Sequence, residues 1–368
     1  MKTKVTVIDR DALRDEDLEE AARILKTGGL VAFPTETVYG LGANALDEKA
    51  AAKIYAAKGR PSDNPLIAHI ASPSDLKPLV KEIPEAAGKL MKAWWPGPLT
   101  MIFPKSSLVP GGTTGGLDTV AVRMPDDEVA RRLIRLAGVP VAAPSANTSG
   151  RPSPTEADHV YQDMDGRIDL ILDGGPVGIG VESTIVDVTG PVPILLRPGA
   201  VTLEMLEETV GAVEVDPAVT GPVSADVKPR APGMKYRHYA PKAKLVLVED
   251  EEWSRAHSRD YGRRRTAVSQ AVTRTITRLA MEEAKKGRRV GIICTDETVE
   301  QYPKSLWVRS LGLRSREETI AHNLFGVLRE FDSLEVEVIY SESFSRDHLG
   351  QAIMNRLSKA AGYHILKV

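Results

Sequence analysis

The sequence predicts an α/β protein of two domains, a larger one with a twisted mixed sheet covered by helices and a smaller one with a Rossmann-like parallel sheet. Three observations support this. The chain has 368 residues, which is more than one hydrophobic core usually organises. Short apolar runs alternate with helical stretches along most of it. A proline-punctuated stretch at 211–242 interrupts the alternation. We therefore expect a first domain at 1–210, a linker at 211–242 and a second domain at 243–368.

The first domain shows strands joined by irregular connections. A helix is expected after the acidic Asp15-Glu16-Asp17, ending at Gly28-Gly29, and a strand follows at 30–34. Further strands are expected at 66–70, 100–103, 120–122, 139–143, 170–172, 185–188 and 194–196, with helices at 47–57, 84–95, 126–137 and 202–209. This irregular order favours a twisted open sheet over a regular βαβ repeat.

The second domain has a simpler pattern. Strands are expected at 245–248, 290–293 and 336–340, separated by helices near 265–286, 316–331 and 348–361. That spacing suits a small parallel sheet. No Gly-x-Gly-x-x-Gly follows its first strand, so a dinucleotide is not implied. The run Arg263-Arg264-Arg265 is interpreted as a solvated helix start rather than a nucleic-acid contact.

Composition limits the class of protein. Hydrophobic residues make up 42% and charged residues 27%, and the net charge is -2, so the whole chain does not attract nucleic acid or anionic lipid and any anion site must be local. The single Cys294 forms no internal disulfide and excludes multi-cysteine metal sites; we expect a buried thiol. Without a signal peptide or a long apolar span, the expected location is cytoplasmic, with no membrane association.

Candidate chemistry lies where polar side chains gather beside Gly and Pro at strand ends. No P-loop, kinase or metalloprotease signature is present. Lys58-Gly59-Arg60, followed by Ser62 and Asn64, forms a compact donor cluster for phosphate or carboxylate. Cations at a helix C-terminus also interact favourably with its dipole, which explains this segment equally well.

Four other segments add polar groups. Thr35 and Thr37 lie in a segment that also fits a plain strand, turn and strand. His69 is either a substrate ligand or a satisfied core residue. Ser145 lacks the Gly-x-Ser-x-Gly elbow of a hydrolase nucleophile, and Trp94-Trp95 is interpreted as a structural turn. The remaining candidates are Arg123, Asn147, Ser183 and Arg197.

Together these segments supply Lys58, Arg60, Arg123 and Arg197 beside hydroxyls and an amide, with no obvious pair of general bases. This suggests catalysis by positioning and charge neutralisation. Such a site suits attack of a carboxylate or carbamate on the α-phosphate of ATP, because the nucleophile is already anionic and the pyrophosphate leaving group needs cations. The chain is therefore expected to activate a small acid with ATP.

The segments also carry a resemblance to a known family. They are Thr-Glu-Thr-Val-Tyr-Gly-Leu at 35–41, Lys58-x-Arg60 with Asn64-Pro-Leu66, Pro-Gly-Pro-Leu-Thr at 96–100, Ser145-x-Asn147, and Glu-Ser-Thr-Ile-Val-Asp at 182–187. The chain resembles the Sua5/YrdC/YwlC family of threonylcarbamoyl-AMP synthases, in its long Sua5 form. A YrdC-like catalytic domain would cover roughly 10–205, and the tail would correspond to the Sua5 domain.

The resemblance implies a reaction. L-Threonine, bicarbonate and ATP would give L-threonylcarbamoyladenylate and pyrophosphate, the first step towards N6-threonylcarbamoyladenosine at position 37 of tRNA. Catalytic roles would fall to Lys58, Arg60, Ser145 and Asn147. Threonine would be bound by Thr35, His69, Arg123, Ala143 and Ser183, and ATP by Lys58, Arg60, Asn64, Thr119, Ser145, Ser153, Arg197 and Tyr239.

Partners and cofactors follow from the same resemblance. Mg²⁺ would accompany ATP, although no carboxylate cage is visible, and a separate tRNA-modifying transferase would receive the product. A direct contact with tRNA, or double-stranded RNA binding, is left open.

The linker segment from Pro229 to Pro241 is similar to the one that distinguishes the long form. Carrying Lys235, Arg237, His238 and Tyr239, it would fold over the active site as a lid and exclude water.

Two other functions remain as alternatives. A double-stranded RNA or tRNA binding module would use the same cations on phosphates, but the near-neutral charge and the lack of aromatic stacking motifs disfavour it. Another carbamoyl-transfer enzyme with a YrdC-like domain, of the hydrogenase-maturation kind, would carry cysteine-rich motifs that this sequence lacks.

Overall fold

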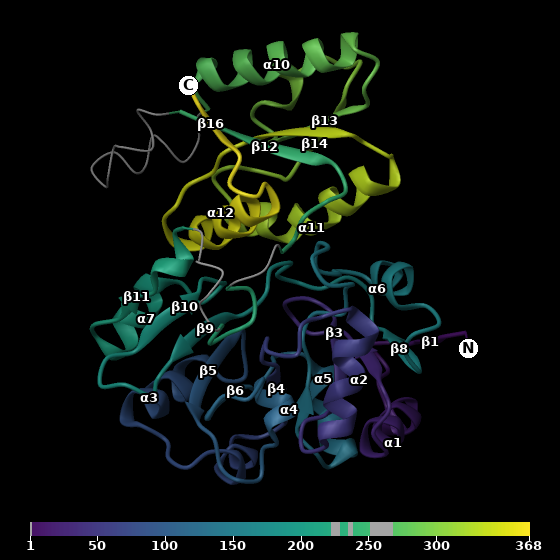
Figure 1. Ribbon diagram of the computed structural model, residues 1–368, viewed down its shortest axis with the longest axis vertical. Coiled ribbons are helices and arrows are strands. Elements are labelled where there is room, and N and C mark those ends of the chain that lie inside the picture. The colour runs from purple at the N-terminus through teal and green to yellow at the C-terminus, as the bar shows by residue number, and fades with distance from the viewer. Residues whose placement is uncertain (1, 222–228, 235–237, 251–267) are drawn as a thin grey trace. The chain divides into compact units, whose positions relative to one another are not determined.

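The computed structural model describes residues 2–221, 229–234, 238–250 and 268–368. The chain divides into two compact units (Figure 1). The first comprises Met1–Ser149 and Ser153–Tyr236, and the second comprises Gly150–Pro152 and Arg237–Val368. No helix among the described residues is both long and apolar enough to cross a membrane.

The first unit is built on a mixed sheet. Its described residues form an 11-stranded sheet in the order β1-β8-β2-β3-β7-β4-β6-β5-β9-β10-β11. Parallel pairs such as β4 with β6 alternate with antiparallel pairs such as β5 with β6. The strands are β1 (Lys4–Val7), β2 (Val31–Phe33), β3 (Gly40–Asn44), β4 (Ile67–His69), β5 (Leu99–Pro104), β6 (Thr119–Arg123), β7 (Val141–Ala142), β8 (Leu170–Asp173), β9 (Thr184–Asp187), β10 (Ile194–Arg197) and β11 (Glu214–Val215).

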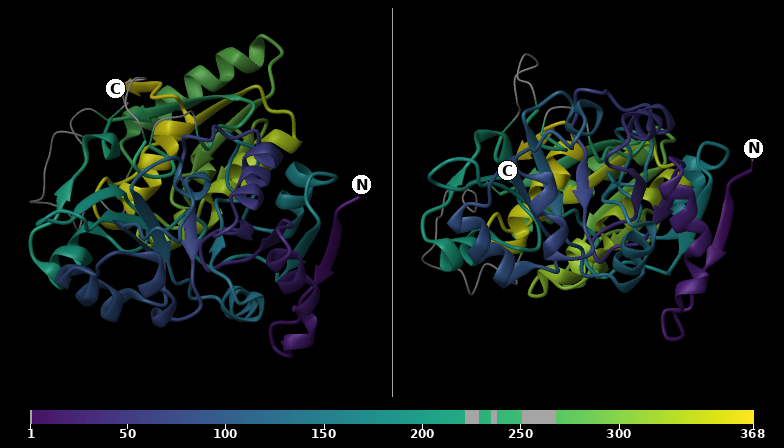
Figure 2. Two further views of the ribbon diagram at one scale, coloured as in Figure 1. Left: turned by 60° about the horizontal axis from the view of Figure 1, so that its bottom comes forward. Right: turned by 90° about the horizontal axis from the view of Figure 1, so that it is seen from below.

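Helices cover both faces of this sheet, as Figures 1 and 2 show. One core cluster joins the sheet to α2, α3, α6 and α7, and another joins it to α1 and α5. A short helix, α4, contacts α2. The helices are α1 (Glu19–Lys26), α2 (Glu48–Lys58), α3 (Glu85–Trp94), α4 (Gly111–Thr114), α5 (Glu128–Ala137), α6 (Ala157–Met164) and α7 (Leu203–Val210).

A third, smaller cluster lies on the face that α1 and α5 share. It contains Ile67, Ala121 and Ile185 from β4, β6 and β9, and three linker residues, Ala218, Ala231 and Met234, pack against them. Successive strand residues point to opposite faces, so Arg123 lies on the same face as Ala121, and His69 on the same face as Ile67. This face, between the α1/α5 cluster and the linker residues, carries the candidate site.

The second unit has a parallel sheet in the order β14-β13-β15-β12-β16. Its strands are β12 (Lys244–Glu249), β13 (Val290–Cys294), β14 (Trp307–Ser310), β15 (Val338–Glu342) and β16 (Ile365–Lys367). In Figure 1, α10 (Gln270–Lys285) lies on one side of this sheet, and α11 (Glu317–Ser333) and α12 (His348–Ala360) lie on the other. The result is a three-layer α/β/α arrangement of the Rossmann-like kind.

The predicted fold class is confirmed for both units. The expected strands and helices of the first unit are present to within a few residues, and Cys294 is buried, which raises the pKa of its thiol. The prediction missed the strands β1, β3, β11, β14 and β16 and the helices α4 and α6. Trp95 is buried and donates to the carbonyl of Leu99 at 2.7 Å, as a structural turn requires. The run at 263–265 lies outside the described residues.

Candidate active site

The Lys58-Gly59-Arg60 segment ends helix α2. Gly59 caps the helix in the left-handed conformation, with φ 62°, which glycine adopts without steric cost. The Lys58 ammonium donates to the carbonyls of Ser145 and Asn147. Arg60 turns the other way and donates to the carbonyls of Asn64 and Pro65, at 3.3 and 3.1 Å. Two predicted segments therefore meet around Lys58.

The segment Ser145 to Asn147 is itself ordered by hydrogen bonds. The Ser145 hydroxyl donates to Oδ1 of Asn147 at 2.6 Å, and Ser145 pairs with Gly40 in an isolated antiparallel bridge. Nearby, Asn64 is buried, and its Oδ1 accepts no hydrogen bond from any described residue. A buried acceptor without a donor calls for a ligand or water.

Arg123 lies at the centre of the polar face. In the sheet register it stands beside His69 of β4 on one side and beside Thr100 of β5 on the other. Thr100 and Ser183 share a hydrogen bond between their hydroxyls at 2.8 Å. Arg197 then donates to the carbonyl of Ser183 at 3.0 Å and to its hydroxyl at 3.1 Å. Polar groups thus lie along one face of the sheet from β4 through β6, β5 and β9 to β10.

The Thr35–Thr37 loop adds to this row. Nη1 of Arg123 donates to the Thr37 hydroxyl at 3.0 Å, and that hydroxyl lies 2.9 Å from the hydroxyl of Thr35. Nε of Arg123 donates to the carbonyl of Gly97 at 3.3 Å. Nη2 lies 2.6 Å from Oε2 of Glu36 as an ion pair. The guanidinium is therefore held on three sides.

His69 is buried, and its Nδ1 lies 3.1 Å from the carbonyl of Ile67. Burial, and then the positive charge of Arg123, lower the pKa of His69 to about 3. The imidazole is neutral at physiological pH and is a weak base. The amide of Ala143 donates to the same carbonyl of Ile67 at 2.9 Å, which brings Ala143 next to His69.

The remaining predicted residues are spread more widely. The Ser153 hydroxyl donates to Glu182, next to Ser183. Thr119 begins β6, on the face of Arg123 but at the opposite end of the strand. Tyr239 belongs to the second unit, where its ring stacks on Phe325 at 5.4 Å between centroids. Lys235 and Arg237, which the lid prediction used, lie outside the described residues.

Three polar residues of this face escaped the sequence analysis: Glu36, Thr100 and Glu182. Thr100 alternates with the buried Leu99 and Met101, which places it on the opposite face from them. That alternation could have identified it. Nothing local predicts that Glu36 meets Arg123, because the pair depends on how β2 and β6 are placed in the sheet.

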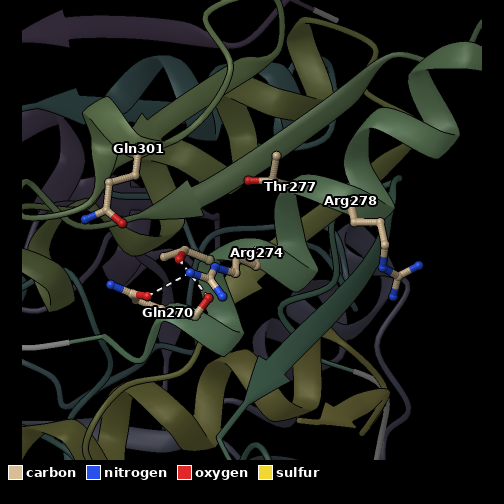
Figure 3. A pocket seen from close by; sticks show the side chains of 6 residues that line it. Gln270, Arg274, Thr277, Arg278 and Gln301 are labelled. Carbon is tan, nitrogen blue, oxygen red and sulfur yellow. Dashed lines mark hydrogen bonds between the residues drawn. The ribbon is translucent and has the colours of Figure 1, made fainter.

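A separate groove lies in the second unit. Its volume is about 490 Å³, and Gln270, Thr273, Arg274, Thr277, Arg278 and Gln301 line it (Figure 3). Arg274 donates to Oε1 of Gln270 at 3.0 Å, and Arg278 pairs with Glu282 at 2.9 Å. This lining has no carboxylate, imidazole or thiol, so the groove does not compete with the polar face as a reaction centre.

The fold and this face define a two-domain α/β enzyme for anionic substrates, since four buried cations, Lys58, Arg60, Arg123 and Arg197, lie among hydroxyls in the first unit. Two family models match the chain. The one described as telomere recombination covers residues 23–199. The one described as threonylcarbamoyl-AMP synthase, C-terminal domain, covers residues 201–362.

Similar proteins point the same way. The threonylcarbamoyl-AMP synthase of Pyrococcus abyssi is 49% identical over 98% of this chain and 98% of its own. That of Bacillus subtilis is 47% identical over 100% of both chains. A crystal structure of Pyrococcus abyssi Sua5 complexed with L-threonine superposes with a TM-score of 0.88, covering 100% of both chains at 49% identity. The chain belongs to the threonylcarbamoyl-AMP synthase family.

Proposed function

We propose that the polar face of the first unit is where L-threonine, bicarbonate and ATP react to give L-threonylcarbamoyladenylate and pyrophosphate. The observation that carries this assignment is a row of buried polar groups on one face of the sheet. Arg123 donates to Thr37 at one end and Arg197 donates to Ser183 at the other, and Thr100, the register neighbour of Arg123, shares a hydrogen bond with Ser183 between them. It places a guanidinium at each end of a set of hydroxyls, which suits a substrate with a carboxylate at one end and phosphates further along.

Threonine is assigned to the Arg123 end. The guanidinium is preorganised by Thr37 and Gly97, so it meets a carboxylate without losing further side-chain freedom. Neutral His69 and Ala143 lie beside it and give the pocket one wall. Thr35 and Ser183 supply hydroxyls. The threonine bound in the Pyrococcus abyssi structure supports threonine as the amino acid.

ATP is assigned to the groups around Lys58, Arg60 and Arg197. Lys58 and Arg60 flank a glycine at the end of α2, and the unpaired acceptor of Asn64 suits an amino group such as that of adenine. Ser145 and Asn147, with Lys58, would neutralise phosphate charge as pyrophosphate leaves. Thr119, Ser153 and Tyr239 complete the proposed nucleotide contacts.

Mg²⁺ is proposed as the counterion that ATP brings with it. Among the described residues, no group of three or more His, Cys, Asp or Glu is arranged to hold a metal ion. The residues present therefore do not build a protein-held magnesium site, and the charge neutralisation proposed here relies on Lys and Arg. The product would pass to a separate tRNA-modifying transferase in the cytoplasm, and a direct contact with tRNA belongs to the same proposal.

A single assay tests the proposal. The purified chain is incubated with ATP, labelled bicarbonate and pyrophosphatase, and phosphate release is compared with threonine, with serine and without an amino acid. Release and label incorporation are expected with threonine. Turnover that does not depend on threonine, or RNA binding without turnover, would contradict the proposed reaction.

A further inference from the structure

Glu36 and Arg123 form a pair whose hydrogen-bonding capacity is largely unused. Oε2 of Glu36 lies 2.6 Å from Nη2 of Arg123, and the two side chains are 13% and 5% exposed. Neither carboxylate oxygen of Glu36, nor Nη2 of Arg123, makes an aligned hydrogen bond with any described residue. Besides the contact between Oε2 and Nη2, the pair therefore keeps acceptor capacity on Glu36 and donor capacity on Nη2 of Arg123 that a ligand can use.

The other charged groups near Glu36 already have partners. Asp127 pairs with Arg10 at 2.9 Å and accepts the amide of Ala130 at 3.1 Å at the start of α5. Burial raises the pKa of Asp127, while Arg10 counteracts that effect and Glu36 adds slightly to it. His69, on the other side of Arg123, is neutral. Among these groups, Glu36 alone is a carboxylate in contact with Arg123.

A free amino acid is a zwitterion, and this pair is its electrostatic complement. If the threonine carboxylate binds the guanidinium of Arg123, the ammonium on the adjacent carbon comes within reach of Glu36. The carboxylate and ammonium of threonine then face the opposite charges of Arg123 and Glu36, and the four charges sum to zero. A buried ammonium without a carboxylate partner would instead cost free energy of binding. This argument rests on the function proposed above.

We propose that Glu36 is a catalytic residue that binds the ammonium of threonine and accepts its proton when the nitrogen is carboxylated. The ammonium N–H bond breaks and the proton moves to a carboxylate oxygen of Glu36. The neutral amine attacks the carbon of bicarbonate, a C–N bond forms, and the hydroxyl leaves as water with a second proton of the amine. The products are the carbamate anion and water, so atoms and charge balance.

The carbamate is then the nucleophile for the α-phosphorus of ATP. Because it is already anionic, that second step needs no base. His69 does not take the role of Glu36, because burial and the positive charge of Arg123 keep its imidazole neutral, so it presents no negative charge to the ammonium of threonine.

The test compares E36Q, E36D and the wild-type chain across pH 6.5 to 9.5, measuring threonine-dependent pyrophosphate release. At neutral pH, E36Q is expected to lose about 10²-fold in kcat and to raise the KM for threonine. The deficit should shrink as the pH rises, because solution then supplies the amine already deprotonated. E36D should keep the wild-type pH profile at an intermediate kcat. The control E85Q, at a side chain 84% exposed, should match the wild type.

Binding gives a readout that does not need turnover. Calorimetry compares L-threonine with its 2-hydroxy analogue, in which a hydroxyl replaces the ammonium. The wild-type chain should prefer threonine by at least about tenfold, the equivalent of one modest ion pair, and E36Q should lose most of that preference. An E36Q deficit that is constant with pH, or an unchanged preference for threonine, would overturn the role of Glu36.

Failure of the proposed function and failure of the proposed role of Glu36 give different results. A wild-type chain with no threonine-dependent pyrophosphate release refutes the proposed function, whereas an active wild type matched by E36Q refutes only the role of Glu36. If E36Q does not fold, as judged by thermal melting, E36D decides: a lower kcat with a preserved pH profile supports the proposal, and unchanged kcat and KM contradict it.

Discussion

Arg197 donates two hydrogen bonds to Ser183, one to its carbonyl at 3.0 Å and one to its hydroxyl at 3.1 Å. Its Nη1 donates to the carbonyl of the linker residue Pro232 at 3.4 Å. One buried guanidinium therefore joins the start of β9 to the linker. Only a planar group with several fixed donors can make these three contacts together.

We expect the R197K variant to lose most of its activity in pyrophosphate release, although the positive charge remains. A lysine ammonium cannot reproduce the planar set of donors of the Arg197 guanidinium. The Ser183 side chain therefore loses the hydrogen bond that orients it, and the linker loses its contact with this residue. The kcat/KM for pyrophosphate release should fall at least about tenfold. The matched control is R230K: Arg230 pairs with Asp187 and Asp216 and is 43% exposed, so its exchange should change kcat/KM less than threefold, within the small range of exposed ion pairs. Equal losses in both variants would contradict this reading.

Two glycines should respond differently to alanine. Gly59 has φ +62°, but a Cβ there would meet no atom within 4 Å, so G59A should lower the free energy of unfolding by about 1 kcal/mol through backbone strain alone. A Cβ on Gly199 would lie 2.4 Å from the amide nitrogen of Thr184. Backbone atoms cannot yield cheaply, so G199A should cost more than about 2 kcal/mol.

Urea unfolding of the two glycine variants checks this order. G199A should also reduce activity, because Thr184 follows Ser183 directly. If G59A loses more free energy of unfolding than G199A, the short contact distances at Gly199 do not limit the stability of the protein.

His69 gives the protein a pH-dependent stability. Its pKa is about 3 in the folded chain and about 6.5 in the unfolded chain. Between these values the unfolded state binds a proton that the folded state does not, so stability falls as the pH drops through this range, by up to about 1.4 kcal/mol per pH unit. Above the unfolded value the contribution is constant.

H69N removes this titration and should flatten the dependence between pH 4 and 6.5. The measurement is the free energy of unfolding in urea at several pH values, with H364N as the control, since His364 is exposed. A wild-type slope that H69N leaves unchanged would show that other groups cause the acid sensitivity.

The fold was largely predictable because strong local signals coincide with its elements. Gly59 ends α2 where the Lys-Gly-Arg segment predicted, and the three strands and three helices expected in the second unit are present. The edge strands β14 and β16 were missed, since each is short, is not buried and depends on pairing with a neighbour already in place.

The sequence predicted which types of residue form the site, but not which of them contact one another. Arg123, Ser183 and Arg197 were identified as polar groups near strand ends, which alternation and strand boundaries reveal. The Glu36 contact could not be inferred, because β2 and β6 are far apart in the sequence and their relation depends on the whole strand order. The Lys58 ammonium donates to the carbonyls of Ser145 and Asn147, a contact between distant segments that a sequence does not indicate.

Truncation of the linker separates its packing role from any role in catalysis. A chain ending at Gly221 lacks Pro232, which accepts from Arg197, and Ala231 and Met234, which pack against Ile67 and Ile185. It should be less stable than a chain ending at Met234, because its apolar surface on β4 and β9 becomes exposed to water. Each Å² of such surface costs about 25 cal/mol of folding free energy.

Activity then tests the lid. If the segment beyond Met234 closes the site against water, both truncated chains should give much less threonylcarbamoyladenylate than the full chain, although the chain ending at Met234 is the more stable. Product yield is measured together with pyrophosphate release, since loss of the labile intermediate lowers the first more than the second. Full product yield from the chain ending at Met234 would show that Tyr239 and the second unit are dispensable for the reaction. The linker would then contribute only by packing on the sheet.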